Sequence, residues 1–198
     1  MDINRTYFTN PSSCIDNLSK INQEGSATDK LKIIHDEIKR HMPFLKRIAV
    51  IVYEEKSGLL KTFIHSDDNE DKILQFYQSK LSNSASLSEI AHSRIPRIVN
   101  DQGIFERSIK KHSRFIAKRN YGASHTTPFY IEGQFAGLIF MNSRDKNVFN
   151  KTSCDLLSPF IDLIELLVRK EIELLNILHN SVTTALDHGK KPGKVSAA

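Results

Sequence analysis

The chain has 198 residues, of which 39% are hydrophobic and 26% are charged, and its net charge is +5. These values are typical of one globular domain with a hydrophobic core, and they exclude a fully disordered chain. No apolar run approaches the roughly 20 residues of a membrane-spanning helix, and the N-terminus lacks the apolar stretch of a secretory signal. We therefore expect a cytoplasmic protein with no membrane partner, in which Cys14 and Cys154 are free thiols.

The excess of basic residues lies mainly in the stretch 107–119 and in the C-terminal tail. The tail, residues 188–198, is rich in Gly, Pro and Lys and lacks apolar periodicity, so we predict that it is disordered. No DNA or RNA recognition motif accompanies the remaining charge, and we expect no nucleic-acid partner. We interpret the basic stretch as the solvated face of a helix, with an anion site or a partner surface as the alternative.

The first predicted elements are a helix and a β-hairpin. Ser26 and Asp29 have the spacing of a capping box, and the apolar residues that follow recur every three or four positions, which predicts a helix over 28–41. A β-branched run over 47–55 and a second run over 59–66 flank a Lys-Ser-Gly turn. This arrangement predicts two antiparallel strands.

The middle of the chain has weaker patterns. Residues 73–81 fit a strand or a helix. Ser86 has the spacing of a capping residue for a short helix over 86–92, and Pro96 separates that helix from a short strand over 97–100. Clear helix and strand patterns return after this region.

Three elements are predicted for the second half of the chain. An apolar face predicts a helix over 101–119, and the stretch 122–143 reads as two strands joined by a Gly-containing turn. Apolar residues at intervals of three and four then predict a long helix over 152–187, with Pro159 interrupting its first turns. Strands in adjacent hairpins with flanking helices indicate an α+β domain built on an antiparallel sheet.

Four pieces of the chain, in order, resemble the GAF domain of bacterial signal-transduction proteins. They are the helix before the first strand and the segments LKRIAVIVYEEKSGLL, HSRIPRIVND and TTPFYIEGQFAGLIFMNS. In the last segment, Pro128, Gly133 and Gly137 stand where the family's hairpin has Pro and Gly. In the third, Ser93 or Arg94 stands where many members have Gly.

The resemblance implies an antiparallel sheet of about six strands with helices on both sides and a long C-terminal signalling helix. One sheet face would hold a pocket beneath the short helix and the irregular segment, and the terminal helices would mediate dimers on the other face. The expected domains are an N-terminal extension with a short helix (1–27), the GAF domain (28–168), a coiled-coil-like connector helix (169–187) and the disordered tail (188–198).

Several activities of the family do not fit this sequence. Methionine sulfoxide reduction needs a pair of pocket thiols, whereas Cys14 precedes the domain and Cys154 opens the last helix, so we expect no enzyme. No Cys-His pair is present for bilin attachment, and the cyclic-nucleotide signature fails after Asn142. The histidines lack metal-binding spacing, which predicts no metal site. His65 and His125 stay open as haem ligands but are interpreted as hydrogen-bonded or surface residues, so the cofactor is left unassigned.

The strand that begins near residue 124 has an unusual run of polar side chains. Ser124 and Thr126 share one face of the strand, and His125 and Thr127 share the other. A central strand has no fully solvated face, so one pair is expected to be buried, either satisfied by neighbours or lining a polar pocket. The predicted ligand-binding residues are His65, Ser88, Asn100, Asp101, Ser124, His125, Thr126 and Asn142.

The long C-terminal helix carries an apolar stripe that a monomer would leave uncovered beyond about residue 170. A parallel coiled coil between two copies would bury the predicted interface residues Val168, Leu175, Leu178 and Val182. We therefore predict a non-enzymatic sensor that binds a small polar ligand and relays its occupancy through a dimeric helix to an output domain. One alternative is a structural dimerisation GAF domain without a ligand. The other is a sensory segment of an HD-type cyclic di-GMP phosphodiesterase, because the segment VTTALDHGKK weakly resembles the connector that precedes the phosphodiesterase domain in such proteins.

Overall fold

The computed structural model of the chain describes residues 19–23, 25–68, 78–101 and 121–188, with side chains described as far as residue 182. The predicted helix over 101–119 and most of the predicted N-terminal extension therefore lie outside the described residues. The elements in chain order are η2 (Lys20–Asn22), α2 (Ala27–His41), β1 (Leu45–Glu54), β2 (Leu59–Asp67), β3 (Gln78–Lys80), η4 (Leu81–Asn83), α3 (Ala85–Ser93), β4 (Arg97–Val99), β5 (Ala123–Ile131), β6 (Gln134–Ser143) and α5 (Lys151–His188).

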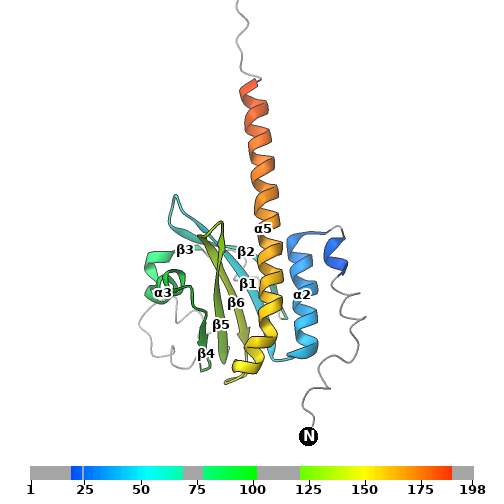
Figure 1. Ribbon diagram of the computed structural model, residues 1–198, viewed down its shortest axis with the longest axis vertical. Coiled ribbons are helices and arrows are strands. Elements are labelled where there is room, and N and C mark those ends of the chain that lie inside the picture. The colour runs from blue at the N-terminus through cyan, green and yellow to red at the C-terminus, as the bar shows by residue number, and fades with distance from the viewer. Residues whose placement is uncertain (1–18, 24, 69–77, 102–120, 189–198) are drawn as a thin grey trace, which may run out of the picture.

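The six described strands form one antiparallel sheet in the order β3-β2-β1-β6-β5-β4 (Figure 1). Both predicted hairpins are present, as β1–β2 and β5–β6. Gly133 has a φ of +80° in the turn between β5 and β6, a backbone conformation that favours glycine. The predicted α+β architecture is confirmed.

Helices α2 and α5 lie side by side on one face of the sheet (Figure 1). The reciprocal capping box predicted at the start of α2 is present, with Asp29 N–H donating to Ser26 Oγ and Ser26 N–H donating to the Asp29 carboxylate. The apolar side chains of both helices pack against the inward residues of the strands. The fully buried centre of this layer includes Ile34, Ile38, Ile48, Val50, Leu157, Ile164 and Val168.

Helix α3 lies against the opposite face, near the end of the sheet where β1 turns into β2. Leu87 and Ile90 of α3 pack against Ile51 and Leu138 of the two central strands. The N-cap of this helix is Ser84, two residues before the predicted Ser86, and its hydroxyl accepts a hydrogen bond from Leu87 N–H. Ser84 has the extended backbone that a capping residue requires, whereas Ser86 already lies within the helix.

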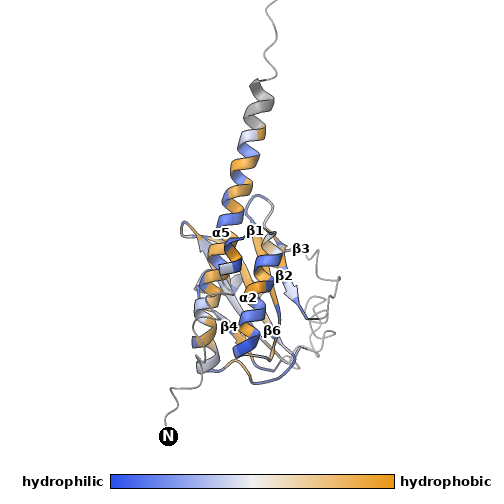
Figure 2. Cartoon of the chain, turned by 90° about the vertical axis from the view of Figure 1, so that its right-hand side faces the viewer, coloured by the Kyte–Doolittle hydropathy of each residue, from blue (hydrophilic) through white to orange (hydrophobic). Residues whose placement is uncertain are grey.

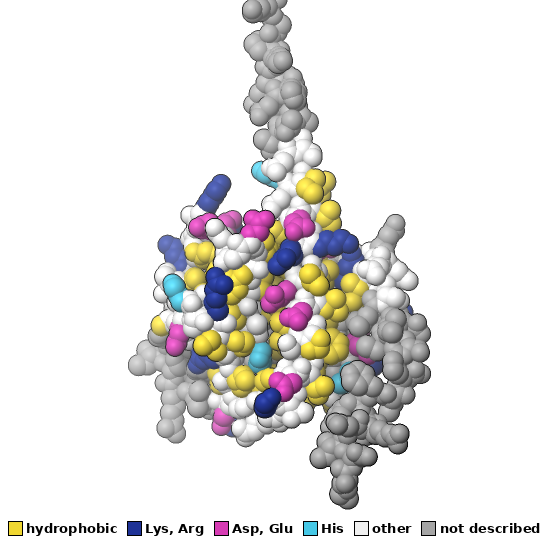
Figure 3. All heavy atoms as spheres, in the orientation of Figure 1, with side chains coloured by type: hydrophobic (Ala, Val, Ile, Leu, Met, Phe, Trp, Pro, Cys, Tyr) yellow, Lys and Arg dark blue, Asp and Glu magenta, His cyan; other side chains and the backbone are white. Residues whose placement is uncertain are grey.

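Helix α5 is a single helix of 38 residues that contains Pro159 and continues well beyond the sheet (Figure 1). Its first turn is closed by a reciprocal pair, in which Ser153 N–H donates to Asn150 Oδ1 and Asn150 N–H donates to Ser153 Oγ. Past the sheet, hydrophobic residues recur along the helix (Figure 2), and their side chains stay exposed (Figure 3). None of the described helices combines the length and the apolar character needed to cross a membrane.

Candidate functional site

Polar side chains from four neighbouring strands meet on the sheet face opposite α2 and α5. Inward residues such as Val50 and Met141 pack in the helix-side core, so their strand neighbours project to the other face. The strand register aligns these neighbours in two adjacent rows across the sheet. One row runs Asp67, Arg47, Asn142, Ser124 and Val99, and the other runs His65, Ala49, Phe140, Thr126 and Arg97. We call Arg47, His65, Asp67, Ser124, Thr126 and Asn142 the polar cluster.

Arg47 is the central charge of the polar cluster. Its Nη1 donates a hydrogen bond of 3.1 Å to Asn142 Oδ1, and its Nε lies 3.8 Å from Asp67 Oδ2. The Arg47 and Asp67 side chains are only 9% and 7% exposed. Tyr121 also donates from its hydroxyl to Asp67 Oδ2 at 2.9 Å. Buried ion pairs are stable only with such additional hydrogen bonds, so the network holds Arg47 in place on the sheet.

Three further members of the polar cluster are buried but incompletely bonded. Ser124 is 9% exposed, and Thr126 and Asn142 are 5% exposed. Neither hydroxyl has a hydrogen-bond partner among the residues that the structure describes, and the same holds for the Asn142 amide nitrogen. The one fully enclosed side-chain nitrogen or oxygen without a partner in the described part of the chain is His35 Nε2. The unpaired atoms of the polar cluster therefore keep access to open space on this face.

His65 lies at the β2 end of the second row and is half-buried. Burial lowers its pKa and the nearby Arg47 guanidinium lowers it further, while Asp67 opposes the shift. The imidazole is therefore neutral at neutral pH, with one ring nitrogen as a donor and the other as an acceptor. Four of the predicted ligand-binding residues, His65, Ser124, Thr126 and Asn142, thus share one sheet face.

His125 does not lie with them, because side chains alternate along β5 and its imidazole projects into the helix-side core. Its ring lies 5.8 Å from the ring of Phe149, and its Nδ1 is 3.2 Å from the Thr127 hydroxyl. Burial lowers the pKa of His125 to about 4. The prediction of a ligand-binding role for His125 is therefore corrected to a role in the core.

Three other predicted residues have structural contacts away from the polar cluster. Asn100 binds the backbone of Phe149 with both ends of its amide, at 2.9 Å and 3.1 Å. Asp101 is exposed and pairs with Lys146 at 3.0 Å. Ser88 Oγ donates to the Leu81 carbonyl and fastens α3 to η4. These side chains turn toward adjoining loops, which single-chain patterns do not reveal.

Sequence reasoning missed Arg47, Asp67 and Tyr121. The signal for Arg47 was present, since it alternates with inward residues of β1 and so had to point to the face opposite α2 and α5. Asp67 is its cross-strand partner, and Tyr121 lies 54 positions after Asp67 in the sequence. These pairings depend on strand register, and no local pattern reports the register.

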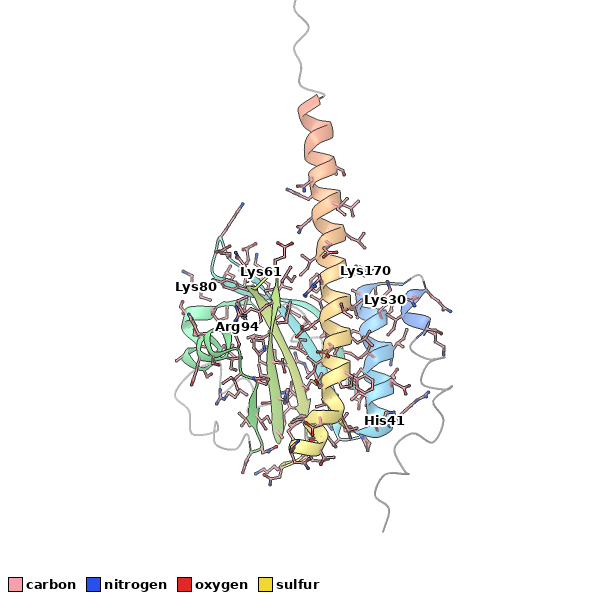
Figure 4. All side chains as sticks on the ribbon, in the orientation of Figure 1. Lys30, His41, Lys61, Lys80, Arg94 and Lys170 are labelled. Atoms are coloured by element: carbon pink, nitrogen blue, oxygen red, sulfur yellow. The ribbon has the colours of Figure 1, made fainter. Side chains whose placement is uncertain are left out.

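The apolar end of the same face is closed by α3. Arg94, at the C-cap of α3, donates to the Gly133 carbonyl at 2.9 Å and lies 4.5 Å from the ring centroid of Tyr130 (Figure 4). The Tyr130 hydroxyl donates back to the Ala91 carbonyl at 2.7 Å. The helix is thus fixed to the β5–β6 hairpin, and the polar rows extend beyond it.

A separate crevice of about 390 Å³ lies at the tips of the hairpins, where α5 leaves the sheet. Its lining includes Val52, Phe135 and Ile172, and it contains no member of the polar cluster. The described cysteine, Cys154, packs against the helix-side core, and burial raises the pKa of its thiol. Neither feature adds a reactive group to the polar face.

Comparison with solved structures gives one consistent result. The chain is similar to the GAF domain of a phosphoenolpyruvate-protein phosphotransferase from Coxiella burnetii (TM-score 0.59, 13% identity, 89% of this chain and 99% of that chain). It is also similar to the phycocyanobilin-bound GAF domain of a cyanobacterial phytochrome (TM-score 0.59, 12% identity, 81% and 94%) and to a GAF domain/HD domain protein from Geobacter sulfurreducens (TM-score 0.58, 15% identity, 77% and 96%). The chain has the GAF fold. No family model and no curated protein matches the sequence.

Proteins with this fold differ in what they do. A type II free methionine-R-sulfoxide reductase from Thermoplasma acidophilum is also similar to the chain (TM-score 0.54, 18% identity, 73% and 92%). At such identities the likeness establishes the GAF fold alone, because one fold hosts many functions.

Proposed function

We propose that this GAF domain is a non-enzymatic sensor that binds a small polar ligand on the polar cluster and relays occupancy through α5. The observation that carries the proposal is the set of three buried, incompletely bonded side chains, Ser124, Thr126 and Asn142, on one sheet face. Because these atoms keep access to open space, either water or a ligand can supply the partners that the described residues do not. A ligand that bonds to all three side chains at once would replace that water.

The path from the polar cluster to α5 is short. Asn100 follows β4, the edge strand that borders both polar rows, and its side chain clasps the backbone of Phe149. Phe149 directly precedes Asn150, which caps α5. A ligand that shifts β4 would therefore shift the start of α5 through this clasp.

A second connection runs through β5 itself. Ser124 and Thr126 flank His125 in the strand, and the His125 ring contacts Phe149 on the opposite face. Displacement of β5 by a ligand would thus reach the same aromatic residue. The two routes converge on Phe149, which is 2% exposed and also contacts Phe44 edge to face.

We further propose that α5 pairs with α5 of a second copy. Leu175, Leu178 and Val182 are 54–61% exposed and have the alternating three- and four-residue spacing of a coiled-coil seam. Val168, which was also predicted for this interface, is fully buried in the chain's own core, so the proposed seam begins after it. An exposed stripe of this kind favours association over a monomer.

A sensor acts on an output domain, and we expect that domain at the end of α5 that lies away from the sheet. The helix leaves the sheet and continues to residue 188. A parallel pair of such helices would carry a change in helix position to a domain that follows, as in a sensory segment of a larger signalling protein. The alternative, a structural dimerisation domain without a ligand, uses the same seam but leaves the polar cluster empty.

Native mass spectrometry of the purified full-length chain tests both parts together. A dimer mass with one retained small molecule per chain supports the sensor. A dimer with no added mass in protein taken gently from cells supports the structural alternative, and a monomer contradicts the proposed seam. The chain mass of 22.6 kDa makes a metabolite-sized addition readily resolved.

A further inference from the structure

We propose that the ligand of the polar cluster is a small oxyanion, a metabolite whose carboxylate or phosphate group sits against Asn142, Ser124 and Thr126. This proposal rests on the proposed function and names the chemical class of its ligand. The argument uses the donors, the acceptors and the charges that the two polar rows bring together.

The part of the polar cluster that still needs partners offers hydrogen-bond donors on three side chains. Asn142 Oδ1 already accepts from Arg47, which leaves the two N–H groups of its amide nitrogen for a ligand. Ser124 and Thr126 add one hydroxyl donor each. Asp67 is the one carboxylate in the cluster, and it is engaged by Tyr121 and Arg47. The Asn142 N–H groups can only donate, and both hydroxyls can donate as well as accept, so one acceptor-rich group can bond to all three side chains.

The geometry suits an anionic group with several oxygens. Asn142 and Ser124 are direct cross-strand partners, and Thr126 is two residues farther along β5 on the same face. Side chains in such positions have Cβ atoms about 4.5–5.5 Å apart across the strands and about 7–8 Å apart on the diagonal. The oxygens of one carboxylate or phosphate group can accept from adjacent donors at that spacing.

The charges favour an anion over a cation. Arg47 lies in the row of Asn142 and Ser124, and Arg97 is the cross-strand partner of Thr126. Both arginines thus lie beside Asn142, Ser124 and Thr126, whereas Asp67, the one carboxylate of the two rows, is engaged by Arg47 and Tyr121. Charges on a buried sheet face interact more strongly than in water, because little solvent screens them. An anionic ligand would therefore meet arginine side chains beside its hydrogen-bond donors, whereas a cationic ligand would find no unengaged carboxylate in the two rows.

The test replaces one amide by a carboxylate. Asn142→Asp keeps an oxygen that accepts from Arg47, so the fold is retained, but it exchanges the two N–H donors for a negative charge. Asn176→Asp makes the same chemical change on the exposed surface of α5 and is the matched control. The full-length chain is titrated with succinate, acetate or inorganic phosphate at constant ionic strength, with neutral succinamide as the reference, and Tm and Kd are measured.

We expect at least one anion to raise Tm saturably, by about 3–6 °C once its concentration exceeds Kd tenfold, in the wild type and in Asn176→Asp. Asn142→Asp should bind the same anion at least tenfold more weakly. A response to phosphate alone assigns a phosphate group, and a response to carboxylates alone assigns a carboxylate. Salt effects on protein surfaces in general would act on all three proteins alike, and an equal response in Asn142→Asp would overturn the proposal.

The oxyanion proposal and the sensor proposal fail in different ways. A neutral or cationic molecule retained in native mass spectrometry, with no anion response, overturns the oxyanion proposal and leaves the sensor standing. An absence of both a retained molecule and an anion response overturns both. A retained molecule that carries a carboxylate or phosphate and is lost in Asn142→Asp supports both.

Discussion

Asn100 and Phe149 lie 49 positions apart in the sequence, and the Asn100 side chain makes two hydrogen bonds to the Phe149 backbone. The Asn100 carbonyl also accepts from Asn147 N–H at 2.9 Å. These three bonds tie the end of β4 to the loop that starts α5. Asn100 therefore connects the sheet edge beside the polar cluster to the start of the long helix.

Replacing Asn100 by Ala should destabilise the domain by about 2–3 kcal/mol, because both backbone groups of the buried Phe149 lose their partner. Urea unfolding of the full chain measures this change. Asn83→Ala, at an exposed position in η4, should change the free energy of unfolding by less than about 0.5 kcal/mol. A loss as small for Asn100→Ala would show that the clasp does not hold the loop.

Replacing Leu175 and Leu178 by Lys should convert the dimer to a monomer while the domain stays folded, because both side chains are exposed in the single chain. Sedimentation velocity reports the assembly, and circular dichroism reports the fold. The control is the double change of Asn176 and Asn180 to Lys, which adds the same charge to the far side of α5. An unchanged dimer mass in the leucine variant would place the interface elsewhere, with α2 as the next candidate.

Acid should destabilise the domain through its two buried histidines. Burial lowers the pKa of both His35 and His125 to about 4, from 6.5, so the folded chain keeps them neutral. Below pH 6.5 the unfolded chain binds protons that the folded chain does not, so stability falls from pH 6.5 toward pH 4 and is flat above 6.5. At pH 5 the loss should be about 2 kcal/mol for each histidine.

Urea unfolding at pH 7, 6 and 5 measures this dependence. His125→Phe should remove about half of it, because an aromatic ring still packs beside Phe149 but no longer titrates. His92→Gln, at an exposed position, is the control variant. Carboxylates with lowered pKa, such as Asp68, act at lower pH and do not contribute in this window. If the free energy of unfolding of His125→Phe depended on pH as strongly as that of the wild type, this result would contradict the role given to His125.

Gly137 lies at a point of β6 where the neighbouring atoms leave no room for a side chain. A methyl group there would collide with the Ile51 carbonyl oxygen and with the ring of Phe129. Gly137→Ala should therefore cost more than about 3 kcal/mol or prevent folding, measured as the yield of folded protein and its Tm. Gly58→Asn is the control, because no atom lies near an added side chain in that turn. A Tm of Gly137→Ala close to that of the wild type would contradict this packing.

The fold could be predicted from the sequence because its signals are local. The capping box at Ser26, the alternation in the two hairpins and the turn at Gly133 each depend on residues within a few positions of one another. The predicted N-cap of α3 was wrong by two residues, because the sequence offers both Ser84 and Ser86 as capping residues. The extended backbone at Ser84 makes that residue the N-cap.

The candidate site could be predicted only in part, for a physical reason. Alternation separated Ser124 and Thr126 from His125, but it could not tell which pair faces the helices. The pairing of β5 with β6 decides that question, and the partner of Ser124 is Asn142. Arg47 and Asn142, 95 positions apart, meet only through strand register. The two hydrogen bonds from Asn100 to the Phe149 backbone are equally non-local, so the sequence alone did not reveal this structural role for Asn100.

The most direct measurement of the central claim compares two adjacent threonines that project to opposite faces of β5. Thr126→Val and Thr127→Val remove the same hydroxyl group, the first from the polar cluster and the second from the helix-side core. Small molecules released by denaturation from each purified full-length variant and from the wild type are quantified by mass spectrometry. We expect the wild type and Thr127→Val to release the same molecule in comparable molar amounts, and Thr126→Val to release at least tenfold less. Equal amounts from all three proteins, or no molecule enriched in the wild type over Thr126→Val, would contradict a ligand site on the polar cluster.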